Sequence, residues 1–237
     1  MTGLPPLPRG RLLVVTAVAA ERDAVAAGLR TAGLPAGAAT VLACGVGPAA
    51  AAAATATALA RDSYGLVVSA GIGGGFAPAA PLGAVAVATE IVAADLGAQT
   101  PEGFASVTEL GFGTVRHLPP PGLVPALAGA LKAVHGPVLT VSTVTGTAER
   151  AAELSARHPG AVAEAMEGFG VAEAATAAGL PVLELRAVSN AVGPRDRAAW
   201  RIGPALAALT TAFALLPAAL ADFGKLPAVL EVEQEHG

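Results

Sequence analysis

The 237-residue sequence contains a single cysteine, Cys44, and has no excess of basic residues. One cysteine excludes an internal disulfide and a thiolate cluster for zinc, and it is consistent with a reducing cytoplasm, where we expect the protein to act. The 14 basic and 18 acidic residues give a net charge of −4. A basic surface for nucleic acid is therefore not expected, and small neutral or mildly anionic ligands remain open as partners.

Sequence motifs for cofactors and metals are also missing. No phosphate-binding P-loop sequence occurs, and the histidines are not spaced like metal ligands: His117, His135, His158 and His236. We therefore predict neither a metal nor a cofactor. The nearly uncharged segment 205–221 is rich in alanine and carries Thr210, Thr211 and Pro217. This composition predicts a packed core helix rather than a membrane span, and no membrane partner is expected.

The composition and the pattern along the chain predict one α/β domain over residues 1–237, with flexible ends at 1–10 and 226–237. The chain is 54% hydrophobic, and no charge run or polar tract divides it. Short β-branched runs alternate with alanine-rich stretches of helical length, which favours a mostly parallel sheet with helices on both faces. The predicted strands are 12–18, 40–44, 66–69, 84–93, 138–142 and 182–188. The predicted helices are 20–32, 48–61, 123–134, 148–157, 168–178 and 205–221.

Two segments allow a second interpretation. Residues 9–20 combine a basic start, an apolar run and small residues, as a signal peptide does, but a buried first strand that ends near Glu21 explains the same pattern. The run 71–75, Gly-Ile-Gly-Gly-Gly, follows a strand and suggests a dinucleotide site. That site needs a helix directly after the glycines, whereas Pro78 and Pro81 follow here. A glycine turn that lets backbone amides approach a sugar or a nucleophile is the better interpretation.

Three segments, in this order and each at a predicted strand end, carry a family resemblance: 16–21 (TAVAAE), 165–170 (AMEGFG) and 186–193 (RAVSNAVG). Together with the glycine run they resemble the nucleosidase and nucleoside phosphorylase superfamily, over about residues 12–190. The branch that they resemble most is the futalosine hydrolases, nucleosidases of the alternative menaquinone pathway. The resemblance implies a three-layer α/β/α domain around a central, mostly parallel, mixed sheet. It also implies a nucleoside substrate, water as the second reactant and a homo-oligomer.

Glu21 is the predicted catalytic base. Cleavage of an N-glycosidic bond by water needs a group that orients and deprotonates the nucleophile, and a carboxylate within hydrogen-bonding reach does this. The resemblance implies that role for Glu21. The alternative is a solvated acid in the first turn of a helix, where it interacts favourably with the helix dipole.

Glu167 and Met166 are the predicted ribose contacts. By the resemblance, Glu167 accepts hydrogen bonds from the 2′ and 3′ hydroxyls and offsets positive charge on the sugar, while Met166 packs on the sugar face. The alternative places Glu164, Glu167 and Glu173 on the exposed face of a helix. The remaining substrate-binding residues implied by the resemblance are Ile72, Gly73, Gly74, Val144, Thr145, Phe169 and Ser189.

Asn190 is the residue from which we predict the leaving base. Nucleosidases that cleave adenine carry Ser-Asp where this chain has Ser189-Asn190. The side-chain amide of Asn190 can donate a hydrogen bond to O6 or N7 of a 6-oxopurine, where a carboxylate would set acceptor against acceptor. Hypoxanthine is therefore the predicted leaving base. The alternative role for Asn190 is a turn before Gly193 and Pro194.

The predicted function is hydrolysis of a 5′-modified inosine, specifically futalosine, by an N-glycosidase with Glu21 and Asn190 as catalytic residues. A phosphorylase and a methylthioadenosine-type nucleosidase of the same fold are alternatives, and a non-catalytic nucleoside sensor is an alternative of another class. No arginine occurs between Arg61 and Arg116, which disfavours phosphate binding beside the glycine run. The cluster Arg195, Asp196, Arg197 and Arg201 forms either a lid with an arginine for a ligand carboxylate or a solvated charge cluster.

Overall fold

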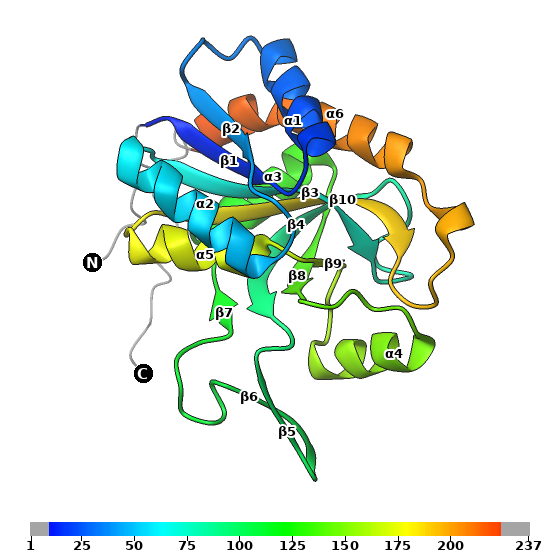
Figure 1. The fold of residues 1–237 in the computed structure, drawn as a ribbon. Coiled ribbons are helices and arrows are strands. Elements are labelled where there is room, and N and C mark those ends of the chain that lie inside the picture. Colours follow the sequence, from blue (N-terminus) through cyan, green and yellow to red (C-terminus); the bar gives the residue numbers. More distant parts are fainter. Residues whose placement is uncertain (1–9, 224–237) are drawn as a thin grey trace, which may run out of the picture.

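The computed structural model describes residues 10–223. The predicted flexible ends therefore lie outside the described residues, except for Gly10. Eight strands form the main sheet: β1 (Leu12–Thr16), β2 (Ala39–Ala43), β3 (Leu66–Gly75), β4 (Val85–Ala93), β7 (Arg116–His117), β8 (Val134–Thr140), β9 (Ala163–Ala165) and β10 (Val182–Ala191). β5 (Gly97–Thr100) and β6 (Gly103–Ser106) form a separate hairpin that extends away from this sheet (Figure 1).

The helices follow the alanine-rich stretches of the sequence. They are α1 (Ala19–Thr31), α2 (Pro48–Arg61), α3 (Leu123–Leu131), α4 (Ala148–Arg157), α5 (Gly168–Ala177) and α6 (Ile202–Phe223), with a short 3-10 helix η1 (Arg197–Ala199). Pro48 occupies the first turn of α2, where its missing N–H is not needed. Thr147 caps α4 by accepting a hydrogen bond from the amide of Arg150. Local sequence signals therefore set several of the helix ends.

The main sheet is mixed, as predicted, but it also closes on itself. Its order is β10-β4-β8-β9-β3-β1-β2, and β10 pairs with β3 as well as with β4. β1 is parallel to β2 and β3, and β10 is parallel to β3, whereas β9 is antiparallel to β3 and β4 is antiparallel to β10. Five strands thus form a closed ring, and β1 and β2 extend it at one side. The carboxyl ends of β1, β3 and β10 meet at one edge.

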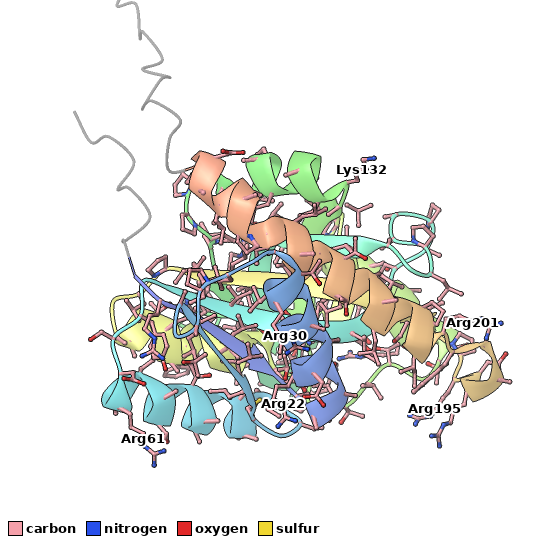
Figure 2. The ribbon with its side chains drawn as sticks, turned by 90° about the horizontal axis from the view of Figure 1, so that it is seen from above. Arg22, Arg30, Arg61, Lys132, Arg195 and Arg201 are labelled. Carbon is pink, nitrogen blue, oxygen red and sulfur yellow. The ribbon has the colours of Figure 1, made fainter. Side chains whose placement is uncertain are left out.

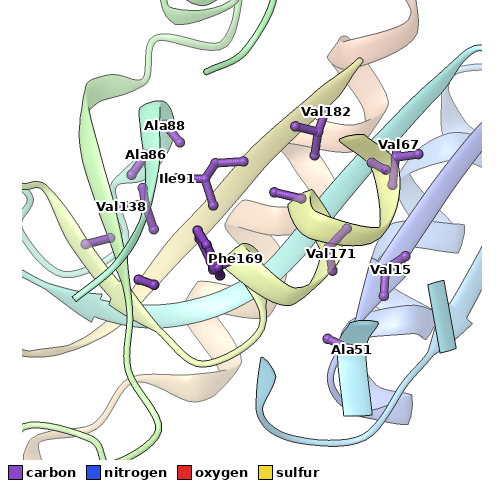
Figure 3. Close-up of a cluster of buried hydrophobic side chains, with 14 of the residues drawn as sticks. Val15, Ala51, Val67, Ala86, Ala88, Ile91, Val138, Phe169, Val171 and Val182 are labelled. Atoms are coloured by element: carbon purple, nitrogen blue, oxygen red, sulfur yellow. The ribbon is translucent and has the colours of Figure 1, made fainter. Parts of the chain in front are cut away.

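Helices cover both faces of this sheet, which confirms the three-layer arrangement (Figure 1). On one face α2 and α5 pack against the strands, and Figure 3 shows Ala51 and Val171 from these helices beside Val15 and Val67 of the sheet. On the other face lie α1, α3 and α6, whose buried residues form a second apolar cluster that includes Val25, Leu127 and Phe213. These two clusters fix the sheet, and therefore the strand ends that carry the site.

α6 is long and apolar enough, by length and composition alone, to span a membrane: its mean hydropathy is 1.8 over a window of 18 residues. One third of that window, 33%, is buried inside the protein. The helix packs along α1 and α3 and against β10, with Leu209, Phe213 and Leu216 inward. The inward side of α6 packs as predicted, but a buried third of the window is less than a helix enclosed in the core would show.

The structure corrects several element boundaries. The predicted helix 123–134 is too long, because Lys132 adopts a left-handed conformation with φ 51° and the β-branched Val134 begins β8. The glycine run is not a turn, since β3 continues through Gly75. The strand predicted at 12–18 ends at Thr16 and is buried in the sheet. The strands β5, β6, β7 and β9 were not predicted.

Candidate active site

A cavity of about 330 Å³ opens at the sheet edge where β1, β3 and β10 end. Open α/β sheets bind ligands at such carboxyl ends, and the volume is at the lower limit of small-molecule pockets, ~300 to 1,000 Å³. Ten of the eleven predicted site residues line it: Glu21, Ile72, Gly73, Gly74, Val144, Thr145, Met166, Glu167, Ser189 and Asn190. Segments far apart in the sequence therefore converge on one site.

Glu21 lies in the first turn of α1, but it is buried rather than solvated, with 3% of its surface exposed. Its Oε2 accepts hydrogen bonds from the amides of Ala17 (2.9 Å) and Val18 (3.2 Å), and its Oε1 accepts one from the amide of Ile72 (2.9 Å). The carboxylate is thus held between the end of β1 and the glycine-containing part of β3. Oε2 is thereby filled, whereas Oε1 keeps an acceptor position for a further donor, such as a water molecule.

Glu167 lies two residues after the end of β9 and is also buried, which rules out the exposed helix face. Its Oε1 accepts a hydrogen bond from the amide of Gly47 at 3.2 Å, and its Oε2 lies 3.3 Å from Nη1 of Arg186. It occupies the N-cap position of α5, so the positive end of that helix also favours its negative charge. Two fixed donors therefore orient the carboxylate that we predict to hold the ribose.

Arg186 is a fully buried cation with a carboxylate or hydroxyl partner at each of its nitrogens. Nε lies 2.8 Å from Oε1 of Glu184, Nη1 contacts Glu167, and Nη2 donates to the hydroxyl of Ser69 at 3.1 Å. Burial disfavours the charged guanidinium, but Glu184 and Glu167 outweigh this effect and raise the pKa of Arg186. At Gly71 an added Cβ would lie 2.6 Å from Oε1 of Glu21 and 2.8 Å from Nη1 of Arg186, so glycine is required there.

Asn190 lies in β10 next to a β-bulge, not in a turn. Its Oδ1 accepts from the hydroxyl of Ser189 at 2.9 Å, and its Nδ2 donates to the carbonyl of Ala191 at 3.0 Å. The Ser189 hydroxyl also lies 3.2 Å from the carbonyl of Gly73. These contacts fix which end of the amide is the donor, and they leave one N–H of Nδ2 free for a ligand.

Phe169 is the predicted site residue that does not line the cavity. It is buried in the first turn of α5, its ring packs against that of His117 with centroids 5.1 Å apart, and its amide donates to the hydroxyl of Thr140 at 2.9 Å. Figure 3 shows it among the apolar core residues. Its neighbour Glu167 points into the site, so the chain turns away from the cavity within two residues.

The arginine cluster before α6 separates into residues at the cavity and residues outside it. Arg195 and Trp200 line the cavity, and the guanidinium of Arg195 lies over the Trp200 ring at 5.4 Å. Arg201 donates from its backbone amide to the carbonyl of Ser189 at 2.7 Å. Figure 2 shows Arg195 and Arg201 at the same end of the molecule, on the segment that leads into α6. This segment therefore borders the site and is tied to β10.

Comparisons with known proteins agree with this geometry. The phosphorylase superfamily matches residues 17–218. A futalosine hydrolase from Streptomyces coelicolor is 62% identical over 95% of this chain and 98% of its own length. One from Acidothermus cellulolyticus is 51% identical over 90% of this chain and 92% of its own. The chain belongs to the futalosine hydrolase family.

The fold of this futalosine hydrolase family member is also that of a solved nucleosidase. The 5′-methylthioadenosine/S-adenosylhomocysteine nucleosidase of Neisseria meningitidis superposes with a TM-score of 0.73, at 20% identity, over 90% of this chain and 99% of that one. At this identity the likeness concerns the fold alone. With the family relationship, the chain is an enzyme of the nucleosidase type.

Sequence reasoning missed three acidic or basic residues of this family member's site. Glu184 and Arg186 are two residues apart among the apolar residues 182–188 of β10, which places both on one buried face, and that spacing was a usable signal. Glu164 lines the cavity and is 5% exposed. Its strand, β9, has three residues and is too short for any periodic signal. The run that holds it was therefore interpreted only as part of a helix face.

Proposed function

We propose that this protein hydrolyses the N-glycosidic bond of futalosine, a 5′-modified inosine, and releases hypoxanthine. The observation that carries the proposal is the convergence of Glu21, Glu167 and Asn190 on one cavity. These residues supply a base for water, a carboxylate for the ribose and a donor for the leaving purine. By the family resemblance, the reaction is a step of the futalosine route to menaquinone in the cytoplasm.

In this mechanism Glu21 orients the attacking water. The three backbone amides that hold its carboxylate keep it in place as the sugar carbon gains cationic character. A positioned carboxylate that accepts a proton from water contributes about 10² to 10⁴ in rate. The water therefore attacks from the side of the cavity that β1 and β3 form.

Glu167 supports the sugar. Its carboxylate, held by Arg186 and by the Gly47 amide, accepts hydrogen bonds from the ribose diol. Its negative charge stabilises the oxocarbenium character of the transition state. Met166, which is half-buried in the lining, packs on the sugar face. The leaving purine takes up negative charge, and the free N–H of Asn190 stabilises that charge at O6 or N7.

The 5′ substituent is assigned to the part of the cavity near Arg195. This arginine is exposed and lies over Trp200, so a carboxylate on the substituent would meet a cation supported by an aromatic ring.

The site of a phosphorylase would need a free cation beside β3 for phosphate. The basic group close to β3 is Arg186, and its nitrogens are already occupied by Glu184, Glu167 and Ser69.

The test is chromatography of the free base after incubation with futalosine, inosine and methylthioadenosine, each with and without phosphate. We expect hypoxanthine from futalosine at the same rate with and without phosphate. A strict phosphate requirement would establish a phosphorylase, and saturable binding without base release would establish a sensor. Sedimentation of the same preparation tests the homo-oligomer that we also propose by analogy with the family.

A further inference from the structure

Three strands place two polar side chains on either side of a glycine at the floor of the cavity. Gly74 of β3 pairs with Glu164 of β9 and with Asn190 of β10. Paired residues on adjacent strands face the same side of a sheet, and adjacent strands lie about 4.8 Å apart, so the two Cα atoms are separated by roughly 10 Å. A Cβ at Gly74 would lie 2.8 Å from Cγ2 of Val192 and 3.3 Å from Nδ2 of Asn190. Glycine therefore lets Val192 and the Asn190 amide approach β3 closely.

Glu164 is buried in the cavity wall, and Thr145 holds it in one orientation. The Thr145 amide donates to Oε1 at 2.8 Å, and the Thr145 hydroxyl donates to Oε2. A carboxylate has about four acceptor positions, so each oxygen keeps one for a ligand. Asn190, in turn, keeps one free N–H. The two sides of Gly74 therefore present an acceptor and a donor.

The mechanism described above does not use Glu164. Tethering the loop at Thr145 does not require a charged group, and burial makes the charge costly, since it raises the pKa of the Glu164 carboxyl. Hydrogen bonds from Thr145 offset part of that cost. A second donor supplied by a ligand would offset more of it.

We propose that Glu164 is a specificity-determining residue that accepts a hydrogen bond from N1–H of a 6-oxopurine while Asn190 donates to O6 or N7. The proposal rests on the proposed function and adds the residue that selects the base. A 6-aminopurine has an acceptor at N1, so the contact with Glu164 becomes mismatched, and its amino group is a donor, so an Asn190 contact at position 6 becomes mismatched too. Sites that hydrogen-bond a specific group discriminate strongly against analogues that lack it.

The test is the substitution Glu164→Gln, assayed on futalosine and on its 6-amino analogue. Glutamine keeps the size and can donate to an unprotonated N1. We expect kcat/KM for futalosine to fall by about 10²-fold or more. The ratio of kcat/KM for futalosine to kcat/KM for the 6-amino analogue should fall by a similar factor. Thr145→Val, which loosens the tether and keeps the carboxylate, should leave that ratio within a few-fold. Glu149→Gln makes the same replacement of a carboxylate by an amide at an exposed position in α4, away from the cavity, and serves as the control.

The outcomes separate the two proposals. If the wild-type protein releases no hypoxanthine from futalosine, the proposed function fails and the role of Glu164 fails with it. If the wild-type protein does release hypoxanthine but Glu164→Gln lowers kcat/KM equally for both substrates, as we expect of Thr145→Val, Glu164 only tethers the loop.

Inhibition of the wild-type protein gives a second test should Glu164→Gln not fold. We expect 1-deazahypoxanthine, which has C–H in place of N1–H, to inhibit at least tenfold more weakly than hypoxanthine. Equal inhibition by the two bases overturns the proposal.

Discussion

Nη1 of Arg186 lies 3.3 Å from Oε2 of Glu167, and both side chains are buried. The carboxylate assigned to the ribose is therefore oriented by a guanidinium from a strand on the other side of β3, and that guanidinium is in turn held by Glu184. Because one cation serves two buried acids, the energetics of the site and the stability of the fold are coupled at Arg186.

Arg186→Met should lower the free energy of unfolding by about 3 to 5 kcal/mol, because it leaves the carboxylates of Glu184 and Glu167 buried without their cation. Urea denaturation measures the change. In the double variant Arg186→Met/Glu184→Met one of these acids is gone, so it should be more stable than Arg186→Met alone. A double variant that is less stable would show that Glu184 is not stabilised mainly by Arg186.

Glu21→Gln should lower turnover of futalosine by about 10² or more, because the amide cannot accept a proton from water. The structure adds a second effect. Glu21 accepts from three backbone amides on its two oxygens, so one end of a glutamine must set a donor against a donor. We expect a loss of about 1 to 3 kcal/mol in unfolding free energy as well. Nearly normal turnover in a folded variant would show that Glu21 only anchors the start of α1.

Asn190→Asp replaces the N–H donor that faces the cavity with an acceptor or a protonated acid of nearly the same volume. Activity on futalosine should fall, and activity on the 6-amino analogue should rise relative to it. The measurement is the ratio of the two kcat/KM values, with circular dichroism to verify folding. An unchanged ratio would remove Asn190 from base recognition.

Cys44 should react slowly with alkylating reagents and should report on the charge of Glu167. Burial, and next the negative charge of Glu167, raise the pKa of this thiol to about 11. At pH 8 the thiolate fraction is therefore roughly 10²-fold below that of an ordinary cysteine, and the rate of iodoacetamide labelling should fall accordingly. Glu167→Gln should accelerate labelling, whereas Glu149→Gln should not. Equal rates in all three proteins would contradict the closeness of Cys44 and Glu167.

Two glycine-to-alanine substitutions in helices should change stability in opposite directions. At Gly170 in α5 an added Cβ would lie 2.0 Å from the carbonyl oxygen of Pro48, so Gly170→Ala must push α5 from α2 and should destabilise the protein. At Gly129, exposed in α3, nothing lies within 4 Å of the added atom, and alanine should stabilise by up to about 1 kcal/mol. Thermal unfolding compares the two. A stable Gly170→Ala variant would show that α2 and α5 are not held at this contact.

The sequence predicts the layers and the strand ends of this protein because those features are local. β-branched runs and alanine-rich stretches identify most of the strands and helices, and Glu21 and Asn190 are placed at strand ends by the same pattern. The pairing of β10 with both β3 and β4 depends on sheet curvature, which no local pattern contains. β9 is too short to be detected, and with it Glu164 was assigned to the wrong kind of element.

The candidate site was predicted from motifs, and its supporting contacts were not. Ten of eleven residues line the cavity, while Phe169 turns into the core because α5 begins directly after Glu167. Besides Arg186, the partners that orient Glu21 and Glu167 are the backbone amides of Ala17, Val18, Gly47 and Ile72, and any sequence can supply an amide. Their identity therefore appears only when the fold brings them together.

The closed ring of strands has a consequence for synthesis of the chain. β10 is the last strand within residues 10–223, yet it pairs with β3 and β4, and even β4 ends at Ala93, 89 residues before β10 begins at Val182. Until residues 182–191 leave the ribosome, the ring stays open and Arg186 and Asn190 are missing from the site. Contacts between such distant segments slow folding, and partly exposed strands attract other chains. Nascent chains that end before β10 should therefore be inactive and dependent on chaperones.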